Sequence, residues 1–108
     1  MLESAYHSCL YYEFTKAGLT FEHEVHLPLI YDGVEIPMAY RVDFIVENRL
    51  IVELKCVDAV LPVHLAQLLS YLRLSGHKLG LLLNFHVSYM RDGVYRKING
   101  REWELDEK

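Results

Sequence analysis

The chain has 108 residues, of which 52% are hydrophobic and 24% are charged, and its formal net charge is −4 at pH 7. This length and composition predict one globular domain over residues 1–108 and exclude a disordered chain. No apolar run is long enough to span a membrane, so we expect a soluble protein. The charge excludes a domain that holds nucleic acid by a basic surplus alone. The negative charge is compatible with an enzyme whose carboxylates bind metal ions, which in turn bind phosphates.

The N-terminal residues and the cysteines indicate the cell compartment. MLESAYHSCL lacks the basic segment, apolar core and cleavage site of a secretory signal. Cys9 and Cys56 are far apart in the sequence and form no CxxC pair. Such cysteines are typical of ordinary buried thiols in a reducing compartment. We therefore expect a cytoplasmic protein.

The first half of the chain predicts a helix and then a strand. Apolar residues recur every four positions over residues 2–17, and Gly18 follows them. This spacing predicts an amphipathic helix that ends at the glycine. FEHEVHLPLIY alternates apolar and polar residues, which predicts a strand that ends near Pro28. The Asp-Gly pair of YDGV then predicts a turn.

The rest of the chain predicts a hairpin, a helix and a further strand. Strands are expected over about residues 38–47 and 50–57, on either side of ENR. A leucine-rich helix follows Pro62 and ends at Gly76. KLGLLLNF predicts a strand covered on both faces, RDGVYRKI is interpreted as an additional edge strand, and NGREWELDEK as a solvated tail. The order α-β-β-β-α-β predicts an α/β (α+β) fold, with a mixed sheet flanked by helices.

One register gives the predicted hairpin an apolar face. If residues 47–49 form a three-residue loop, all facing pairs on that face are apolar or aromatic. These pairs are Val46–Leu50, Phe44–Val52, Val42–Leu54 and Tyr40–Cys56. A slip of one residue would pair these side chains with charged ones. The same register places Asp43 opposite Glu53, with Lys55 on the same side.

Two carboxylates that face each other across paired strands need compensation. Like charges in this position destabilise a sheet, and a neighbouring ammonium or a divalent cation would offset the repulsion. Asp43, Glu53 and Lys55 are therefore candidate metal-binding and catalytic residues. The competing interpretation is a solvated sheet face on which these charges meet by coincidence. The aliphatic strands, and a later helix that needs a sheet surface to cover, count against it.

Further polar residues lie on the two predicted helices. His64, Gln67 and Tyr71 share one side of the second helix. They are interpreted either as a partly exposed flank or as hydrogen-bond donors directed at the same cleft, and the spacing does not decide between the two. Glu3 is interpreted either as a favourable partner of the helix dipole or as a further carboxylate at the site. Its sequence position alone favours the first interpretation.

These residues resemble the signature of the PD-(D/E)xK nuclease superfamily, which has the restriction-endonuclease-like fold. Asp43, followed by Glu53-Leu54-Lys55 on the next strand, carries this resemblance, and the predicted element order matches the superfamily core. QLLSY resembles the Gln-x-x-x-Tyr element of RecB-type members. More closely, four segments are similar to the GxxExxY family of small bacterial and archaeal proteins: LESAYHSCLYYEF, YRVDFIVENRLIVELK, LPVHLAQLLSYLRLSG and GLLLNF.

The resemblance covers residues 2 to about 94, with some departures. Of the motif that names the GxxExxY family, only Glu3 and Tyr6 are present, because the glycine would precede Met1. A further N-terminal helix that family members usually carry is expected to be missing. The first signature position, often proline, is Val42.

The resemblance implies a Mg²⁺- or Mn²⁺-dependent endonuclease or exonuclease that hydrolyses phosphodiester bonds in DNA, with RNA as the second choice. It implies that Asp43 and Glu53 bind the metal ion together with the backbone carbonyl of Leu54. Lys55 would orient or deprotonate the attacking water, and Glu3 would be an accessory acid.

The remaining residues that the resemblance involves are expected to position the site or the nucleic-acid backbone. They are Gln67 and Tyr71, together with His64 of the same stripe. The alternative function is a catalytically inactive nuclease-fold module that binds nucleic acid or a protein partner. A homodimer is expected only by analogy with small domains that bind duplex DNA. A zinc site built from Cys9, His23 and His26 has the wrong spacing, and no serine or cysteine hydrolase motif is present.

Overall fold

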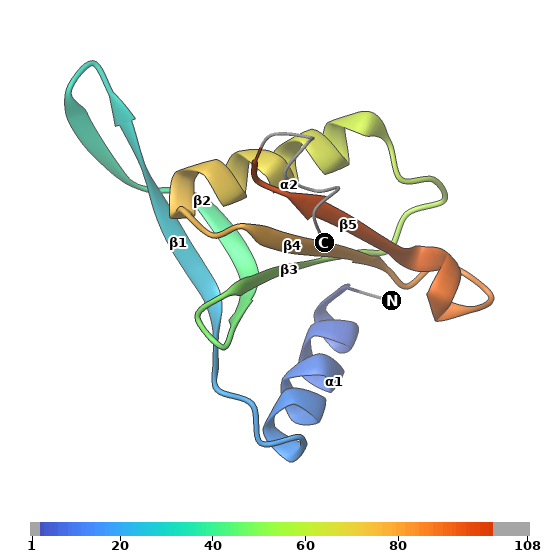
Figure 1. Ribbon diagram of the computed structural model, residues 1–108. Helices are drawn as coiled ribbons and strands as arrows, with labels where there is room; N and C mark the ends of the chain where they lie inside the picture. The colour runs from blue at the N-terminus through green and yellow to red at the C-terminus, as the bar shows by residue number, and fades with distance from the viewer. Residues whose placement is uncertain (1–2, 101–108) are drawn as a thin grey trace.

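The structure is a computed structural model that describes residues 3–100. Its elements follow the predicted α-β-β-β-α-β order and add a fifth strand (Figure 1). They are α1 (Glu3–Lys16), β1 (Phe21–Tyr31), β2 (Val34–Val46), β3 (Leu50–Lys55), α2 (Pro62–Ser75), β4 (Leu79–Asn84), the 3₁₀ turn η1 (Met90–Gly93) and β5 (Val94–Ile98). No helix within residues 3–100 is long and apolar enough to cross a membrane.

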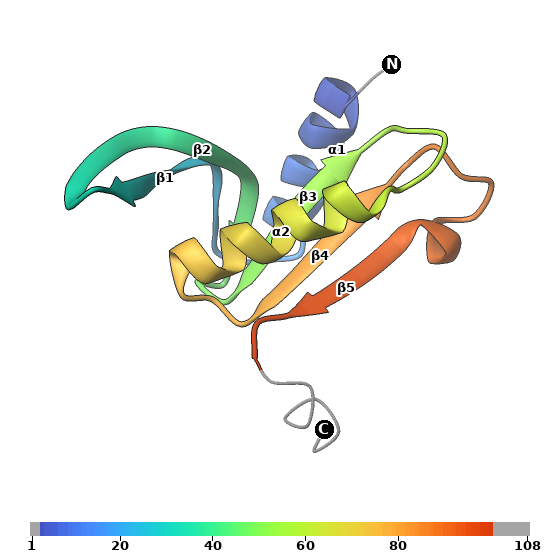
Figure 2. The same cartoon turned by 90° about the horizontal axis from the view of Figure 1, so that it is seen from above.

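A single five-stranded sheet organises the described residues, with the strand order β1-β2-β3-β4-β5. Neighbouring strands are antiparallel except β3 and β4, which are parallel. A parallel pair needs a long crossover connection, and α2 provides it. Figures 1 and 2 show α1 and α2 on opposite faces of the sheet. The predicted mixed sheet flanked by helices is therefore confirmed.

The sheet buries a separate hydrophobic cluster under each helix. On the α1 side the buried residues are Phe44, Val46, Val52 and Leu54, and α1 packs against them with Tyr6, Leu10 and Phe14. On the α2 side the buried residues are Leu27, Val42, Ile45, Ile51, Leu68, Tyr71, Leu72 and Leu82. Each cluster holds its helix against the strands that carry the candidate site.

Two glycines shape the packing of α2. Gly76 ends the helix with φ +78°, in the left-handed region that glycine adopts without strain, as the sequence predicts. Gly80 on β4 lets the helix approach closely, because a Cβ atom there would lie 2.9 Å from Cδ1 of Leu68. Helix α2 is thereby fixed over the centre of the sheet.

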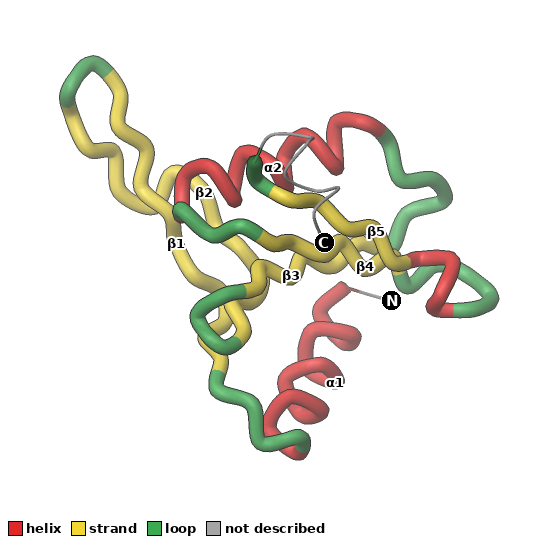
Figure 3. Tube along the Cα trace, in the orientation of Figure 1, coloured by secondary structure: helices red, strands yellow, loops and turns green. Residues whose placement is uncertain are grey.

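Strand β1 is longer than the sequence indicates. The prediction ended it near Pro28, but it continues to Tyr31. Pro28 lies where the β1–β2 register shifts between Leu27 and Leu29, and β1 is an edge strand. Proline fits an edge bulge because no ladder hydrogen bond requires its missing N–H. Beyond the bulge, residues 29–36 form a hairpin, here called the arm, that projects from the body of the molecule (Figure 3).

The β2–β3 hairpin confirms the predicted register only near its loop. Val46 pairs with Leu50 and Phe44 pairs with Val52, around a three-residue turn at residues 47–49. The ladder ends there, and β3 itself ends at residue 55. Two predicted outer pairs are therefore absent from the sheet of the described residues: Val42–Leu54 and Tyr40–Cys56.

Candidate active site

The candidate site lies where β2 and β3 separate. Up to Phe44 and Val52 the two strands form a regular ladder. One residue further along, hydrogen bonds from side chains replace this backbone ladder. The backbone N–H of Asp43 donates to Oε1 of Glu53 at 2.6 Å, and the backbone N–H of Leu54 donates to Oδ2 of Asp43 at 2.8 Å. One oxygen of each carboxylate thus holds the opposite strand, and the second oxygen takes no part in this bridge.

Strands β2 and β1 both depart from regular strand geometry near the bridge. Phe44 packs on the α1 side, whereas Val42 and Tyr40 pack on the α2 side, so the single apolar face predicted for the hairpin is split. On β1, Glu24 lies between His23 and Val25, which pair with Phe44 and Val42, and it has φ +51°. A left-handed backbone is uncommon for a residue other than glycine. The side chains of β2 therefore change the face on which they pack at Asp43, the residue that carries the carboxylate.

A pocket of about 480 Å³ opens beside Asp43 on the α1 side of the sheet. Its lining includes Asp43 and Leu54 from the sheet, and Glu3 and His7 from α1. Nδ1 of His7 lies 4.0 Å from Oδ1 of Asp43, the oxygen that the β2–β3 bridge does not use. The other lining residues are Ser4, Ser8, His23, Glu24 and Arg41. The fold therefore brings Glu3 and Asp43 to one pocket.

Glu53 has a strongly perturbed carboxyl group. Its side chain is buried, with 7% of the residue exposed. Burial raises the pKa of Glu53 to about 8, and the charge of Asp43 adds to the rise. The N–H of Asp43 and the ammonium of Lys55 act on the Glu53 pKa in the opposite direction. In the metal-free protein, Glu53 is therefore mostly protonated at neutral pH.

Tyr71 is the residue of the α2 stripe whose electrostatics couple to the carboxylates. Burial raises the pKa of its phenol to about 12, and the charges of Glu53 and Asp43 contribute to this rise. A side-chain hydrogen bond with Gln67 acts in the opposite direction. Gln67 itself is exposed on α2. Tyr71 therefore keeps its hydroxyl proton at physiological pH and remains a hydrogen-bond donor.

His64, the third residue of the stripe, has a structural role at the start of α2. Its Nδ1 accepts the backbone N–H of Leu61 at 3.0 Å, and its own backbone N–H donates to the carbonyl of Leu61 at 2.9 Å. These bonds satisfy groups that the first turn of a helix would leave unpaired. Contact between His64 and a substrate stays a prediction.

The sequence that forms both helices and the sheet matches a known family. A family profile described as the PD-(D/E)XK nuclease superfamily matches residues 1–97. The chain belongs to the PD-(D/E)XK nuclease superfamily. Among solved structures, the crystal structure of SSO0001 is similar with a TM-score of 0.70 and 23% sequence identity. The similarity covers 95% of this chain and 53% of SSO0001, so the chain spans about half the length of SSO0001. At this identity the likeness shows a shared fold. Among curated proteins, none matches significantly.

Nucleases of the PD-(D/E)XK superfamily generally use divalent metal ions, and the donors present here fit such an ion. Within residues 3–100, no three His, Cys, Asp or Glu side chains are grouped to hold a metal. Asp43 and Glu53 with a backbone carbonyl are instead hard oxygen donors that leave positions for water, as Mg²⁺ and Mn²⁺ prefer.

The sequence did not predict three polar residues around the candidate site: His7, His23 and Asn84. Nε2 of His7 lies 3.3 Å from Nδ1 of His23, and the His7 ring stacks on Phe44 with 4.3 Å between ring centroids. The only available signal for His7 was its spacing of one helical turn from Glu3. His23 lies on another element, so only the fold brings the two histidines together.

Asn84 fixes the chain just beyond the superfamily signature. It is only 3% exposed. Its Oδ1 accepts the backbone N–H of Val57 at 3.1 Å and of His86 at 3.2 Å, and its Nδ2 donates to the carbonyl of Val57 at 3.0 Å. The N–H of Phe85 donates to the carbonyl of Lys55 at 2.9 Å. These bonds hold the segment that follows Lys55 against the end of β4.

Replacing Asn84 with alanine is expected to lower the free energy of unfolding by about 1–3 kcal/mol, because buried backbone groups lose their partners. Urea-induced unfolding measures this loss. The matched control is Asn99→Ala, which removes two longer hydrogen bonds of 3.4 Å and is expected to cost less. An Asn84→Ala variant as stable as the control variant would contradict the assigned role.

Proposed function

We propose that this chain is a metal-dependent nuclease that hydrolyses phosphodiester bonds in DNA, with RNA as the second choice. The observation that carries the proposal is the carboxylate pair at the separation of β2 and β3. Asp43 and Glu53 each keep one oxygen outside the interstrand bridge, and Asp43 lines a pocket together with Glu3. Superfamily membership supports a nuclease-like fold, and the metal dependence and the substrate are the proposed part.

Each residue of the proposed site has a chemical task. Asp43, Glu53 and the Leu54 carbonyl would hold Mg²⁺ or Mn²⁺. When bound, the ion would supply a Lewis acid for the phosphate and lower the pKa of a bound water. Lys55 orients the water or takes its proton, and offsets charge that develops on the phosphate. Glu3 serves as an accessory acid at the pocket rim.

The polar residues of α2 would position the reacting groups. Tyr71 keeps its proton and donates a hydrogen bond towards the carboxylates or the nucleic-acid backbone. Gln67, which acts on the Tyr71 pKa, would orient the Tyr71 hydroxyl. His64, whose Nδ1 closes the helix, would offer only its Nε2 to a substrate. Binding by the uncharged donors Gln67 and Tyr71 does not require a basic surface.

The test is a cleavage assay on single-stranded, duplex and branched DNA and on RNA, each with Mn²⁺. We expect cleavage of at least one substrate by the wild type, and a loss of about a hundredfold in Lys55→Ala, the typical contribution of a positioned acid or base. Lys78→Ala is the matched control because Lys78 is exposed and, unlike Lys55, is not among the charges that act on Glu53. Equal activity of the wild type and Lys55→Ala would indicate a contaminating nuclease and overturn the assignment.

One observation favours a second candidate function, an inactive nuclease-fold module that binds nucleic acid or a protein partner. Asp43 and Glu53 accept backbone hydrogen bonds between β2 and β3, so they stabilise the fold without any metal. Such a module would bind DNA in a mobility-shift assay, would cleave none of the substrates, and would keep its DNA affinity in Lys55→Ala.

Three further assignments belong to this proposal. We assign the chain to the GxxExxY family on the basis of Glu3 and Tyr6, which lie one turn apart on α1. We regard residues 1–108 as a single nuclease-like domain. We place the protein in the cytoplasm because Cys9 and Cys56 are both free thiols.

A further inference from the structure

Arg41 is the one lysine or arginine among the described residues that line the pocket beside Asp43. It lies two residues before Asp43 on β2. The same lining holds three carboxylates, those of Glu3, Glu24 and Asp43. A phosphodiester that enters the pocket is repelled by these carboxylates and attracted by Arg41, which is a permanent cation. A metal ion at Asp43 offsets charge only at its own ligands, so Arg41 has a separate part to play.

The guanidinium of Arg41 is accessible and only weakly engaged. Its side chain is 53% exposed. Among the described residues its ion-pair partner is Glu24, whose Oε2 lies 3.7 Å from Nη1 of Arg41. This distance is longer than a hydrogen bond, and the Glu24 side chain is itself 51% exposed, so the pair contributes little to stability. An anion can therefore replace Glu24 at the planar fork of N–H donors, which matches the oxygens of a phosphate.

The backbone beside Arg41 has an unusual conformation. Glu24 adopts φ +51° between His23 and Val25. A left-handed backbone is uncommon for a residue other than glycine, and such positions cluster at functional sites. His26 lies opposite Arg41 in the β1–β2 ladder and is exposed. Because opposite residues of an antiparallel pair share one face of the sheet, the His26 ring offers a further hydrogen bond beside the guanidinium.

The position of Arg41 along β2 indicates which phosphate it meets. Two residues of a strand span about 6.6 Å, which is the scale of one nucleotide step along a nucleic-acid backbone. Under the proposed function, the phosphate that reacts lies at the metal ligand Asp43. Arg41 is therefore placed to reach a neighbouring phosphate of the same strand.

We propose that Arg41 binds the phosphate next to the scissile one, and that Glu24 pairs with Arg41 only until the substrate arrives. This inference rests on the proposed function, because it takes the reacting phosphate to lie at Asp43. The substrate exchanges a weak exposed ion pair for a charge-assisted contact with the guanidinium. Recognition then requires two consecutive phosphodiesters, so the substrate is a nucleic-acid chain and not an isolated phosphate ester.

The first test is the salt dependence of binding to labelled single-stranded DNA, duplex DNA and RNA oligonucleotides. Mn²⁺ is present, and every protein carries Lys55→Ala so that cleavage is slow. We expect Arg41→Gln to raise the dissociation constant about tenfold. We also expect it to reduce the slope of log affinity against log salt concentration by about 0.7–0.9, the loss of one phosphate contact. Arg41→Lys retains the charge and is expected to retain the slope, with a smaller loss of affinity. Glu24→Gln removes the competing carboxylate and is expected to tighten binding about threefold.

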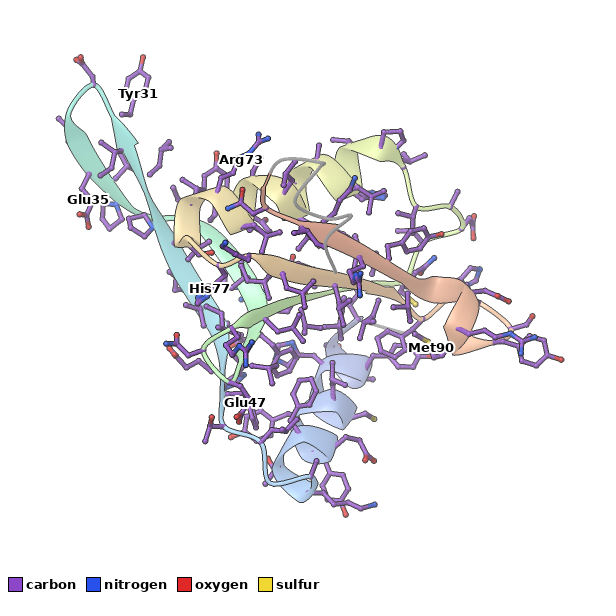
Figure 4. All side chains as sticks on the ribbon, in the orientation of Figure 1. Tyr31, Glu35, Glu47, Arg73, His77 and Met90 are labelled. Carbon is purple, nitrogen blue, oxygen red and sulfur yellow. The ribbon has the colours of Figure 1, made fainter. Side chains whose placement is uncertain are left out.

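Arg73→Gln is the matched control for Arg41→Gln. Arg73 is exposed on α2, which lies on the other side of the sheet from α1 (Figure 4). It is two residues from Tyr71, so the two side chains do not share a face of the helix. The same chemical change is therefore expected to leave both the dissociation constant and the slope unaltered. Circular dichroism shows that each variant is folded.

The outcomes separate this inference from the proposed function. If Arg41→Gln matches Arg73→Gln in affinity and slope while the protein with Lys55 intact cleaves a substrate, the inference is wrong and the proposed function stands. If no substrate is bound or cleaved, both are wrong. Binding that depends on Arg41 without any cleavage would overturn the proposed function and, with it, the placement of Arg41 next to a scissile bond.

Oligonucleotides with a single uncharged methylphosphonate linkage locate the phosphate that Arg41 binds. The wild type is expected to cleave about tenfold more slowly when the neutral linkage adjoins the cleaved bond on one side. Arg41→Gln is expected to be insensitive to a neutral linkage at that position, because it has already lost the contact. Equal sensitivity of the wild type and Arg41→Gln at both adjoining linkages would overturn the inference.

Discussion

Asp43→Asn is expected to lower Mn²⁺-dependent cleavage by about a thousandfold or more. A metal ion contributes several kcal/mol to the stabilisation of a phosphoryl transition state, and each 1.4 kcal/mol corresponds to about a tenfold change in rate. The change removes the negative charge but retains an oxygen that accepts the N–H of Leu54. The variant therefore separates loss of the metal ligand from loss of the bridge between β2 and β3.

The matched control for this variant is Asp58→Asn. Its side chain is 97% exposed and pairs with His86 outside the pocket, so the same chemical change is expected to leave cleavage unaltered. The comparison uses initial cleavage rates on the substrate that the wild type cleaves fastest. Each rate is divided by the concentration of folded protein. If Asp43→Asn cleaved as fast as Asp58→Asn, the carboxylate pair would not be the catalytic centre.

Glu53→Gln is expected to stabilise the metal-free protein at alkaline pH and to have little effect in acid. The pKa of Glu53 is about 8 in the folded protein, against 4.5 for a free glutamate carboxyl group. The proton that the folded state retains contributes stability below the unfolded pKa, and this contribution is lost as the pH rises through the folded pKa. At about 1.4 kcal/mol for each pKa unit, the loss has a ceiling of about 5 kcal/mol. Glutamine carries no charge, so the Glu53→Gln variant does not undergo this loss of stability.

Thermal unfolding in the presence of a chelator measures this linkage between about pH 5 and about pH 9. The stability difference between Glu53→Gln and the wild type is expected to grow as the pH rises through this window. Glu22→Gln, an exposed change on β1, is the control and should show no such growth. A difference that is constant with pH would mean that Glu53 is ionised throughout in the folded protein.

The sequence predicted the fold well wherever a local pattern determines the structure. The spacing of apolar residues predicted both helices, and Gly76 marks the end of α2. Apolar pairing predicted the register at Phe44–Val52. Pro28 misled the prediction, because proline usually ends a strand. Here it lies at a register shift in an edge strand, which only the pairing with β2 reveals.

The candidate site could be predicted only in part, because its geometry also depends on how the strands pair. The spacing brought Asp43 and Glu53 together, but it treated them as side chains above an intact ladder. The ladder instead ends at Phe44, and the two carboxylates bond the backbone of the opposite strand. That arrangement accompanies the left-handed backbone of Glu24 on a third strand. Contacts of this kind join distant parts of the sequence, and no local pattern records them.

The central claim, that Asp43 and Glu53 form a metal site, is tested most directly by calorimetric titration of the wild type and Asp43→Asn with Mn²⁺. The wild type is predicted to bind Mn²⁺ and to release a proton near neutral pH, because Glu53 must ionise to become a ligand. Asp43→Asn is predicted to lose this binding while remaining folded. Equal Mn²⁺ affinity in the two proteins, or no binding by the wild type, would contradict the claim.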